Sequence, residues 1–106
     1  MSTRATIAFR RDDGRFEAVY LHFDGYPEHT GVILDQHYAD SELARSLVAG
    51  GDLCGFDDQT HQPEHYGDGQ PPAVMPTMPA LLDFARKCAA AYLYVFEDGR
   101  WQMQKV

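Results

Sequence analysis

Histidine and aspartate side chains gather where a predicted strand ends and the following helix begins. His22 and Asp24 stand at the end of the strand, and His29 and His37 belong to the helix after it. Imidazoles together with a carboxylate are ligands that zinc and other transition metals accept. The spacing fits no established ligand motif, and such residues more often form ordinary hydrogen bonds, so we expect no metal here. We interpret the group as a structural turn or a possible ligand site, made of His22, Asp24, Gly25, Tyr26, Pro27 and His37.

The segment from Asp24 to Pro27 is predicted to be an architectural turn before it is a binding site. It must lead a strand into a helix within a few residues, and we expect Gly25 to supply a backbone conformation that a side chain would disfavour. We also expect Tyr26 to lay its ring against the preceding strands. Loss of that ring would then cost about 2–4 kcal/mol if it is buried.

Two further patterns indicate chemistry more weakly. His61 and His65 have a spacing that would place both rings on one face of a helix, but Pro63 prevents that helix. Asp24 with Glu28 would make a pair of carboxylates for acid and base catalysis, yet nothing nearby predicts the apolar setting that raises a carboxyl pKa. Acidic residues are common at helix starts because they interact favourably with the helix dipole.

The motifs of the common cofactor enzymes are absent from the sequence. It contains no Gly-x-Gly-x-x-Gly, no phosphate-binding loop and no Cys-x-x-Cys. Cys54 and Cys88 are interpreted as small buried apolar residues because no cationic pair adjoins either one. We therefore expect no catalytic residue, no cofactor and no enzymatic activity, although a site built from scattered residues such as His22 and Asp24 stays open.

The charge of the chain restricts its partners. Nine Lys and Arg oppose sixteen Asp and Glu, which gives a formal net charge of -7. This charge repels nucleic acid and anionic lipid, and it attracts a basic protein surface such as a nucleic-acid groove. We expect such a surface to meet the acidic residues Asp12, Asp13, Asp57, Asp58, Glu64 and Asp68.

The elements that position these residues follow from hydrophobic periodicity and turn chemistry. Two hairpins are predicted, each with an Asp-Gly pair in its turn, and they bracket three helices. The chain of 106 residues is long enough for one core, so we expect a single α+β domain. Its predicted sheet is four-stranded and antiparallel, with two to three helices mainly on one face. The predicted ranges are strands at 3–10 and 16–23, helices at 27–38, 41–49 and 80–89, and strands at 91–96 and 101–106.

Residues between the second and third helices are predicted to be irregular. The stretch 52–56 is interpreted as a short buried connection. Residues 57–79 are rich in proline and polar side chains, which predicts a long loop. Loops of this length are often functional, so this loop is a candidate for a partner-specific insertion.

The expected compartment is the cytoplasm. Two cysteines are too few for a disulfide framework, and the first residues lack the apolar core of a signal peptide. The longest apolar run extends only from Ala89 to Phe96, whereas a membrane-spanning helix needs about 20 residues.

Several short segments in the first half of the chain resemble a family of small uncharacterised bacteriophage and prophage proteins. Members of that family start with Met-Ser-Thr-Arg and carry a His-x-Asp-Gly-Tyr-Pro segment, then a Gly-x-x-Leu helix and a Gly-Asp-Leu turn. The resemblance implies an origin in a mobile element and brings no known activity with it. The matching segments here are Met1 to Ile7, Tyr20 to Pro27, Gly31, Leu34, His37 and Tyr38, and Gly51 to Leu53.

These observations favour a protein that acts by binding another protein in a host cell. Small acidic phage proteins often block host defence complexes, and anti-CRISPR proteins that occupy a nucleic-acid-binding surface are one such class. The alternative is a small-ligand or nucleotide-binding domain, or a weak metal-dependent hydrolase, that uses the region of His22 and Asp24. A structural accessory protein of a virion or replication complex is a third possibility.

Overall fold

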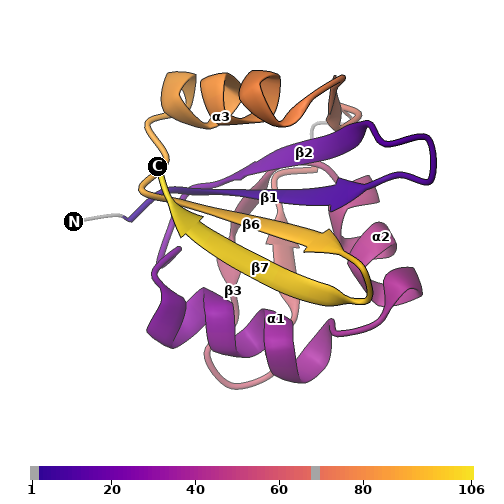
Figure 1. Ribbon diagram of the computed structural model, residues 1–106. Coiled ribbons are helices and arrows are strands. Elements are labelled where there is room, and N and C mark those ends of the chain that lie inside the picture. The colour runs from indigo at the N-terminus through magenta and orange to yellow at the C-terminus, as the bar shows by residue number, and fades with distance from the viewer. Residues whose placement is uncertain (1–2, 68–69) are drawn as a thin grey trace.

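The computed structural model describes residues 3–67 and 70–106 of the chain (Figure 1). Helices lie on both sides of a twisted sheet. The bounds are β1 Ala5–Arg10, β2 Phe16–Leu21, η1 Pro27–Gly31, α1 Val32–His37, α2 Ser41–Ala49, β3 Leu53–Phe56, β4 Pro63–His65, β5 Ala73–Met75, α3 Met78–Lys87, β6 Tyr92–Glu97 and β7 Arg100–Lys105.

Both predicted hairpins are confirmed. β1 pairs antiparallel with β2, and β6 pairs antiparallel with β7. Their turns contain residues in the left-handed region, namely Gly14 at a φ of 87° and the pair Asp98 and Gly99 at 54° and 78°. Turns of this handedness match the twist of the strands they join, which is why Asp-Gly pairs predict hairpins well.

The predicted helices are also present, with some ends displaced. The segment 27–38 forms η1, a π-helical turn, which runs into α1 at Gly31. Asp40 caps α2, because its Oδ1 accepts the backbone N–H of Leu43 at 2.9 Å. The side chain of Thr77 caps α3 in the same way, so this helix begins earlier than residue 80.

The prediction of a four-stranded antiparallel sheet is wrong. In the part of the chain that the structure describes, the sheet has seven strands in the order β4-β3-β2-β1-β6-β7, with β5 also paired to β2. The two hairpins join through β1 and β6, which run parallel, and β2 and β3 are parallel as well. Alternation along a strand predicts which side chains share a face. It does not predict whether a strand far away in the sequence pairs in a parallel or an antiparallel orientation. The mixed sheet therefore depends on the crossover through the helices.

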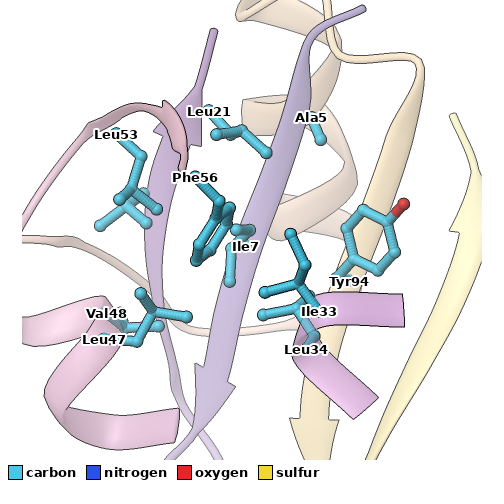
Figure 2. Close-up of a cluster of buried hydrophobic side chains, with 11 residues drawn as sticks. Ala5, Ile7, Leu21, Ile33, Leu34, Leu47, Val48, Leu53, Phe56 and Tyr94 are labelled. Atoms are coloured by element: carbon cyan, nitrogen blue, oxygen red, sulfur yellow. The ribbon is translucent and has the colours of Figure 1, made fainter. Parts of the chain in front are cut away.

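The sheet is covered on both faces, and not mainly on one. One core cluster joins Ile7 and Val19 to α1 and α2, and Figure 2 shows most of its side chains. Ala8 and Ala18 are adjacent to Ile7 and Val19 and therefore face the other side of the sheet. They form a second cluster with Leu81 of α3. In Figure 1, α3 lies on one side of the sheet and α1 and α2 lie on the other. Strands buried on both faces suit the parallel pairing at the centre of the sheet.

The described residues of the stretch 52–79 include three strands that the sequence did not indicate. Residues 53–56 form β3, which pairs with β2 at Leu21 and Leu53. Within the predicted long loop, β4 pairs with β3 and β5 pairs with β2. Strands of three residues are too short to show an alternating pattern, and Pro63 is tolerated because β4 is an edge strand. The segments 53–56, 63–65 and 73–75 are therefore tied into the sheet.

Candidate functional site

The turn after β2 is held in place by its own backbone. Gly25 donates its N–H to the carbonyl oxygen of Thr3 at 2.8 Å, and the Tyr94 hydroxyl donates to the carbonyl oxygen of Gly25 at 2.7 Å. The hydroxyl of Thr30 donates to the carbonyl oxygen of Asp24 at 2.8 Å. The segment is thus an architectural turn that ties the start of β1 and the first helix to β6.

Two details of this turn differ from the prediction. The left-handed residue is Asp24, with a φ of 59°, and not Gly25. Gly25 is required for space instead, because a Cβ there would lie 2.7 Å from the Cβ of Ala5 and 2.9 Å from the carbonyl oxygen of Thr3. Tyr26 stays 38% exposed, so removal of its ring costs less than removal of a buried ring would.

The histidines that the sequence places near this turn have separate partners. His22 Nδ1 shares a hydrogen bond with the hydroxyl of Tyr20, whereas His37 stacks on His61 with ring centroids 4.5 Å apart. His29 Nε2 lies 2.8 Å from Asp58 Oδ1. Within residues 3–67 and 70–106, no group of three His, Cys, Asp or Glu is arranged to hold a metal ion.

Carboxylates gather around a hollow beyond the end of β2, which we call the acidic hollow. It has a volume of about 270 Å³ and an aromatic wall in which the ring of Phe23 is 45% exposed. The residues come from the turn after β2, from β3 with the bend that follows it, and from β4. They are Phe23, Asp24, Cys54, Gly55, Phe56, Asp57, Asp58 and Glu64.

The carboxylates of the acidic hollow are held to different degrees. Asp57 accepts the backbone N–H groups of Gln59 and Thr60 at 2.8 and 2.7 Å, and these hydrogen bonds lower its pKa. Asp58 pairs with His29, although its own side chain remains largely exposed. Asp57 therefore shapes the bend, while Asp58 presents negative charge at the surface.

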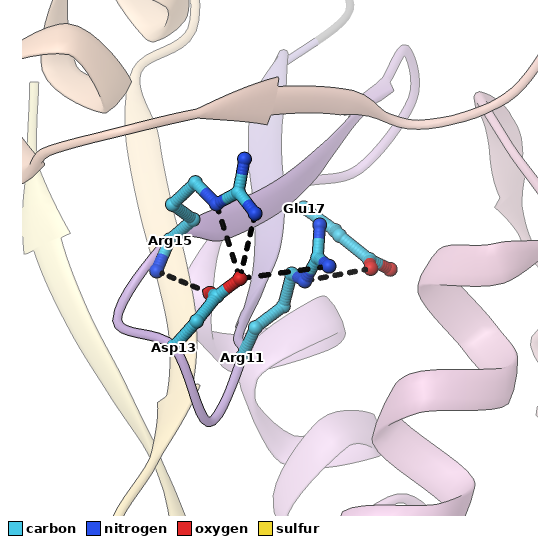
Figure 3. A network of polar contacts seen from close by, with 4 residues as sticks. All are labelled: Arg11, Asp13, Arg15 and Glu17. Carbon is cyan, nitrogen blue, oxygen red and sulfur yellow. Dashed lines mark hydrogen bonds and ion pairs between the residues drawn. The ribbon is translucent and has the colours of Figure 1, made fainter.

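The hairpin between β1 and β2 holds a network of opposite charges (Figure 3). Asp13 accepts the backbone N–H of Arg15 at 3.0 Å, and its other oxygen lies 2.9 Å from Nη2 of Arg15 and 3.6 Å from Nη2 of Arg11. The backbone hydrogen bond, followed by the Arg15 side chain, lowers the pKa of the Asp13 carboxyl. Arg11 also reaches Glu17 at 3.7 Å. The negative charge of this hairpin is thus largely compensated.

The six acidic residues predicted to meet a partner do not form one surface. Asp57, Asp58 and Glu64 line the acidic hollow, and Asp24 joins them. Asp12 and Asp13 follow the carboxyl end of β1, whereas Gly25, beside Asp24, is bonded to Thr3 before the amino end of β1. A strand of this length separates two ends by about 20 Å. Asp68 lies outside the described residues.

A second cavity lies between α3 and the sheet, and we call it the α3-side cavity. It has a volume of about 390 Å³, is open to solvent, and is lined by Tyr20, Asp52, Phe84 and Cys88. The hydroxyl of Tyr20 accepts a hydrogen bond from Nε of Arg4 at 3.0 Å in addition to its contact with His22.

Two further features of the α3-side cavity bear on its chemistry. Asp52 Oδ1 accepts the backbone N–H of Tyr20 at 2.9 Å. Burial raises the pKa of the Cys88 thiol, and the charge of Asp52 raises it further. Both cysteines are half-buried, less enclosed than the sequence suggested.

Sequence reasoning missed the α3-side cavity because its residues come from distant parts of the chain. Tyr20 and His22 share a face of the strand by alternation, and that is the only local signal. Asp52 precedes β3, and Phe84 and Cys88 belong to the far end of α3, so nothing in their spacing brings them together.

Comparison of the chain with protein-family models, with curated proteins and with solved structures gave no match. The resemblance to phage proteins therefore stays a prediction, and function must be argued from the sites themselves. None of the helices in the described part of the chain has the length and apolar character needed to cross a membrane.

Proposed function

We propose that this protein acts by binding a basic surface of another protein, and that the acidic hollow is its contact site. The observation that carries the proposal is the composition of the hollow. Four carboxylates line it together with an exposed phenylalanine, and no lysine or arginine is among the described residues that line it. An aromatic side chain within a polar rim is typical of the energetic centre of a protein interface.

The charge of the hollow indicates the kind of partner. A nucleic-acid groove is lined by Lys and Arg that neutralise phosphates, and clustered carboxylates can occupy the same positions. The net charge of -7 would also speed the encounter with such a groove. We therefore propose a host protein that handles nucleic acid as the partner, without direct binding of nucleic acid by this chain.

The setting is part of the same proposal. The resemblance of the first half of the chain to phage and prophage proteins supports action in the host cytoplasm, as an inhibitor of a host defence complex of the anti-CRISPR kind. Such an inhibitor needs no catalytic group.

The alternative, a ligand site or hydrolase at His22 and Asp24, has less support. His22 is hydrogen-bonded to Tyr20, whereas Asp24 lines the acidic hollow. A phosphate-bearing ligand at Asp24 would also be repelled by the carboxylates of Asp57 and Asp58.

Two variants with equal changes in charge test the proposal. The hollow variant carries Asp24→Asn, Asp58→Asn and Glu64→Gln. The control variant carries Asp35→Asn, Glu42→Gln and Asp98→Asn, at exposed positions of α1, α2 and the second hairpin.

Wild-type protein and both variants are used to capture proteins from a bacterial lysate. We expect the wild type and the control variant to retain a nucleic-acid-binding protein that the hollow variant does not retain. Added DNA or RNA should compete for that protein. The proposal is refuted if the hollow variant retains the same protein, or if nucleic acid at saturating concentration does not compete.

A further inference from the structure

The α3-side cavity contains a carboxylate, Asp52, that forms no ion pair with another described residue. Asp52 is half-buried, and one of its oxygens accepts the N–H of Tyr20. Within residues 3–67 and 70–106, no Lys, Arg or His lies within ion-pair distance of Asp52. A partly desolvated carboxylate gains stability from a nearby positive charge. The cavity thus offers an acceptor and a negative charge to a molecule that enters it.

Aromatic rings form the rest of a cation-binding environment. Tyr20 and Phe84 both line the cavity, one from the sheet and the other from α3. The face of an aromatic ring attracts a positive charge, and it also packs well against an apolar stem. Nearby, Tyr66 is 49% exposed and donates its backbone N–H to the carbonyl oxygen of Asp52 at 3.1 Å.

The orientation of Tyr20 is fixed without blocking the cavity. Its hydroxyl is held by Arg4 and His22, whereas its backbone N–H is held by Asp52. Arg4 and Asp52 therefore lie at opposite ends of the tyrosine. The negative charge of Asp52 lies near the backbone of Tyr20, whereas the positive charge of Arg4 lies near its hydroxyl.

From these contacts we infer that the α3-side cavity binds an alkylammonium group, a positively charged nitrogen on a short apolar stem. Its nitrogen pairs with the oxygen of Asp52 that does not accept the N–H of Tyr20, and its stem lies between Tyr20 and Phe84. The volume of about 390 Å³ falls within the range of small-ligand sites, which accommodates such a group.

Other ligand classes fit the cavity less well. An anion would be repelled by the carboxylate of Asp52. A neutral apolar molecule would remove that carboxylate from water without offering it a partner. A bare metal ion needs several ligands, and the described residues supply no group of three. An organic cation satisfies both the charge and the aromatic walls.

The inference is tested by titrating isotope-labelled protein with n-butylammonium and with n-butanol, which shares its stem but has no charge. Backbone amide shifts in nuclear magnetic resonance spectra report binding. We expect butylammonium to shift the amides of Tyr20 and Cys88 saturably, and butanol to bind at least tenfold more weakly. Equal affinity of the wild-type protein for the two probes would by itself refute the inference.

Three variants assign the site. Asp52→Asn keeps the acceptor for the Tyr20 amide but removes the charge, and we expect it to weaken butylammonium binding at least tenfold. Phe84→Leu should weaken it several-fold through loss of the aromatic face. Asp35→Asn, the matched charge control on the opposite side of the sheet, should bind as the wild type does. Wild-type affinity in a folded Asp52→Asn protein would overturn the assignment.

The ammonium group can come from a free amine or from a lysine side chain of another protein. A short peptide with a single lysine flanked by glycines distinguishes these sources. Tighter binding of the peptide than of butylammonium assigns a protein side chain, and weaker binding assigns a free amine. This site shares no charged residue with the acidic hollow, so the capture experiment and this titration fail independently.

Discussion

Gly25 is packed so closely that even a methyl group does not fit. A Cβ at this position would lie 2.7 Å from the Cβ of Ala5 and 2.9 Å from the carbonyl oxygen of Thr3. Neither neighbour is the end of a flexible side chain, so the start of β1 must move. That movement also strains the hydrogen bonds that Gly25 makes with Thr3 and with Tyr94, which are 2.8 and 2.7 Å long.

We therefore predict that Gly25→Ala lowers the free energy of unfolding by about 2–4 kcal/mol. Overpacking of a close contact costs about 1–3 kcal/mol, and a weakened hydrogen bond adds about 1 kcal/mol. The free energy is measured by urea denaturation followed by circular dichroism.

Two further variants make this prediction specific. Gly31→Ala is the matched control, because its Cβ would meet only ordinary contacts, the nearest at 3.5 Å from the Tyr94 ring. It should be neutral or stabilise the protein by up to about 1 kcal/mol. Adding Ala5→Gly to Gly25→Ala should recover only part of the loss, since the clash with Thr3 remains. A Gly25→Ala protein within about 0.5 kcal/mol of the wild type would refute the packing described here.

Three other variants probe the core and the hairpin. Thr6 is fully buried and its hydroxyl has no hydrogen-bond partner among the described residues, so Thr6→Val should raise the free energy of unfolding by about 1 kcal/mol in urea denaturation; destabilisation would show that the hydroxyl is satisfied. Tyr94→Phe should lower it by about 1–2 kcal/mol because the carbonyl oxygen of Gly25 loses its buried donor, and no change would contradict that bond. The pKa of Asp13 lies below its ordinary value of 3.8 because of its bonds to Arg15, so the stability it contributes is full above 3.8 and is lost as pH falls through the lowered pKa. Thermal unfolding of the wild type and Asp13→Asn should therefore differ near neutral pH and converge in acid, and a constant difference would count against this assignment.

The parts of the fold that could be predicted are those fixed by neighbouring residues. The Asp-Gly pairs at 13–14 and 98–99 specify the hairpins through left-handed turn residues, and Asp40 starts α2 through its own side chain. In contrast, the parallel pairing of β1 with β6 joins residues that lie far apart in the chain. β6 lies within the apolar run from Ala89 to Phe96, which is typical of a strand buried on both faces, so the sequence did contain a signal for a central strand.

The candidate sites divide in the same way. Charge alone indicated an acidic contact surface, and Asp57, Asp58 and Glu64 do share one hollow. Sequence could not show that Asp13 is committed to Arg15, since that depends on the shape of the hairpin. The α3-side cavity could not be predicted from the sequence. Its residues come together only through the parallel pairing of β3 with β2 and the packing of α3 on the sheet.

The most direct test of the proposed function is the association rate of the captured nucleic-acid-binding protein with the wild type, the hollow variant and the control variant. The rates are measured at about 50 and about 200 mM salt, a range over which screening weakens electrostatic steering. We predict that the wild type and the control variant associate equally fast and slow down together as salt rises. The hollow variant should associate more slowly at low salt and depend less on salt. Equal rates for all three proteins, with equal dependence on salt, would contradict the assignment of the acidic hollow as the contact site.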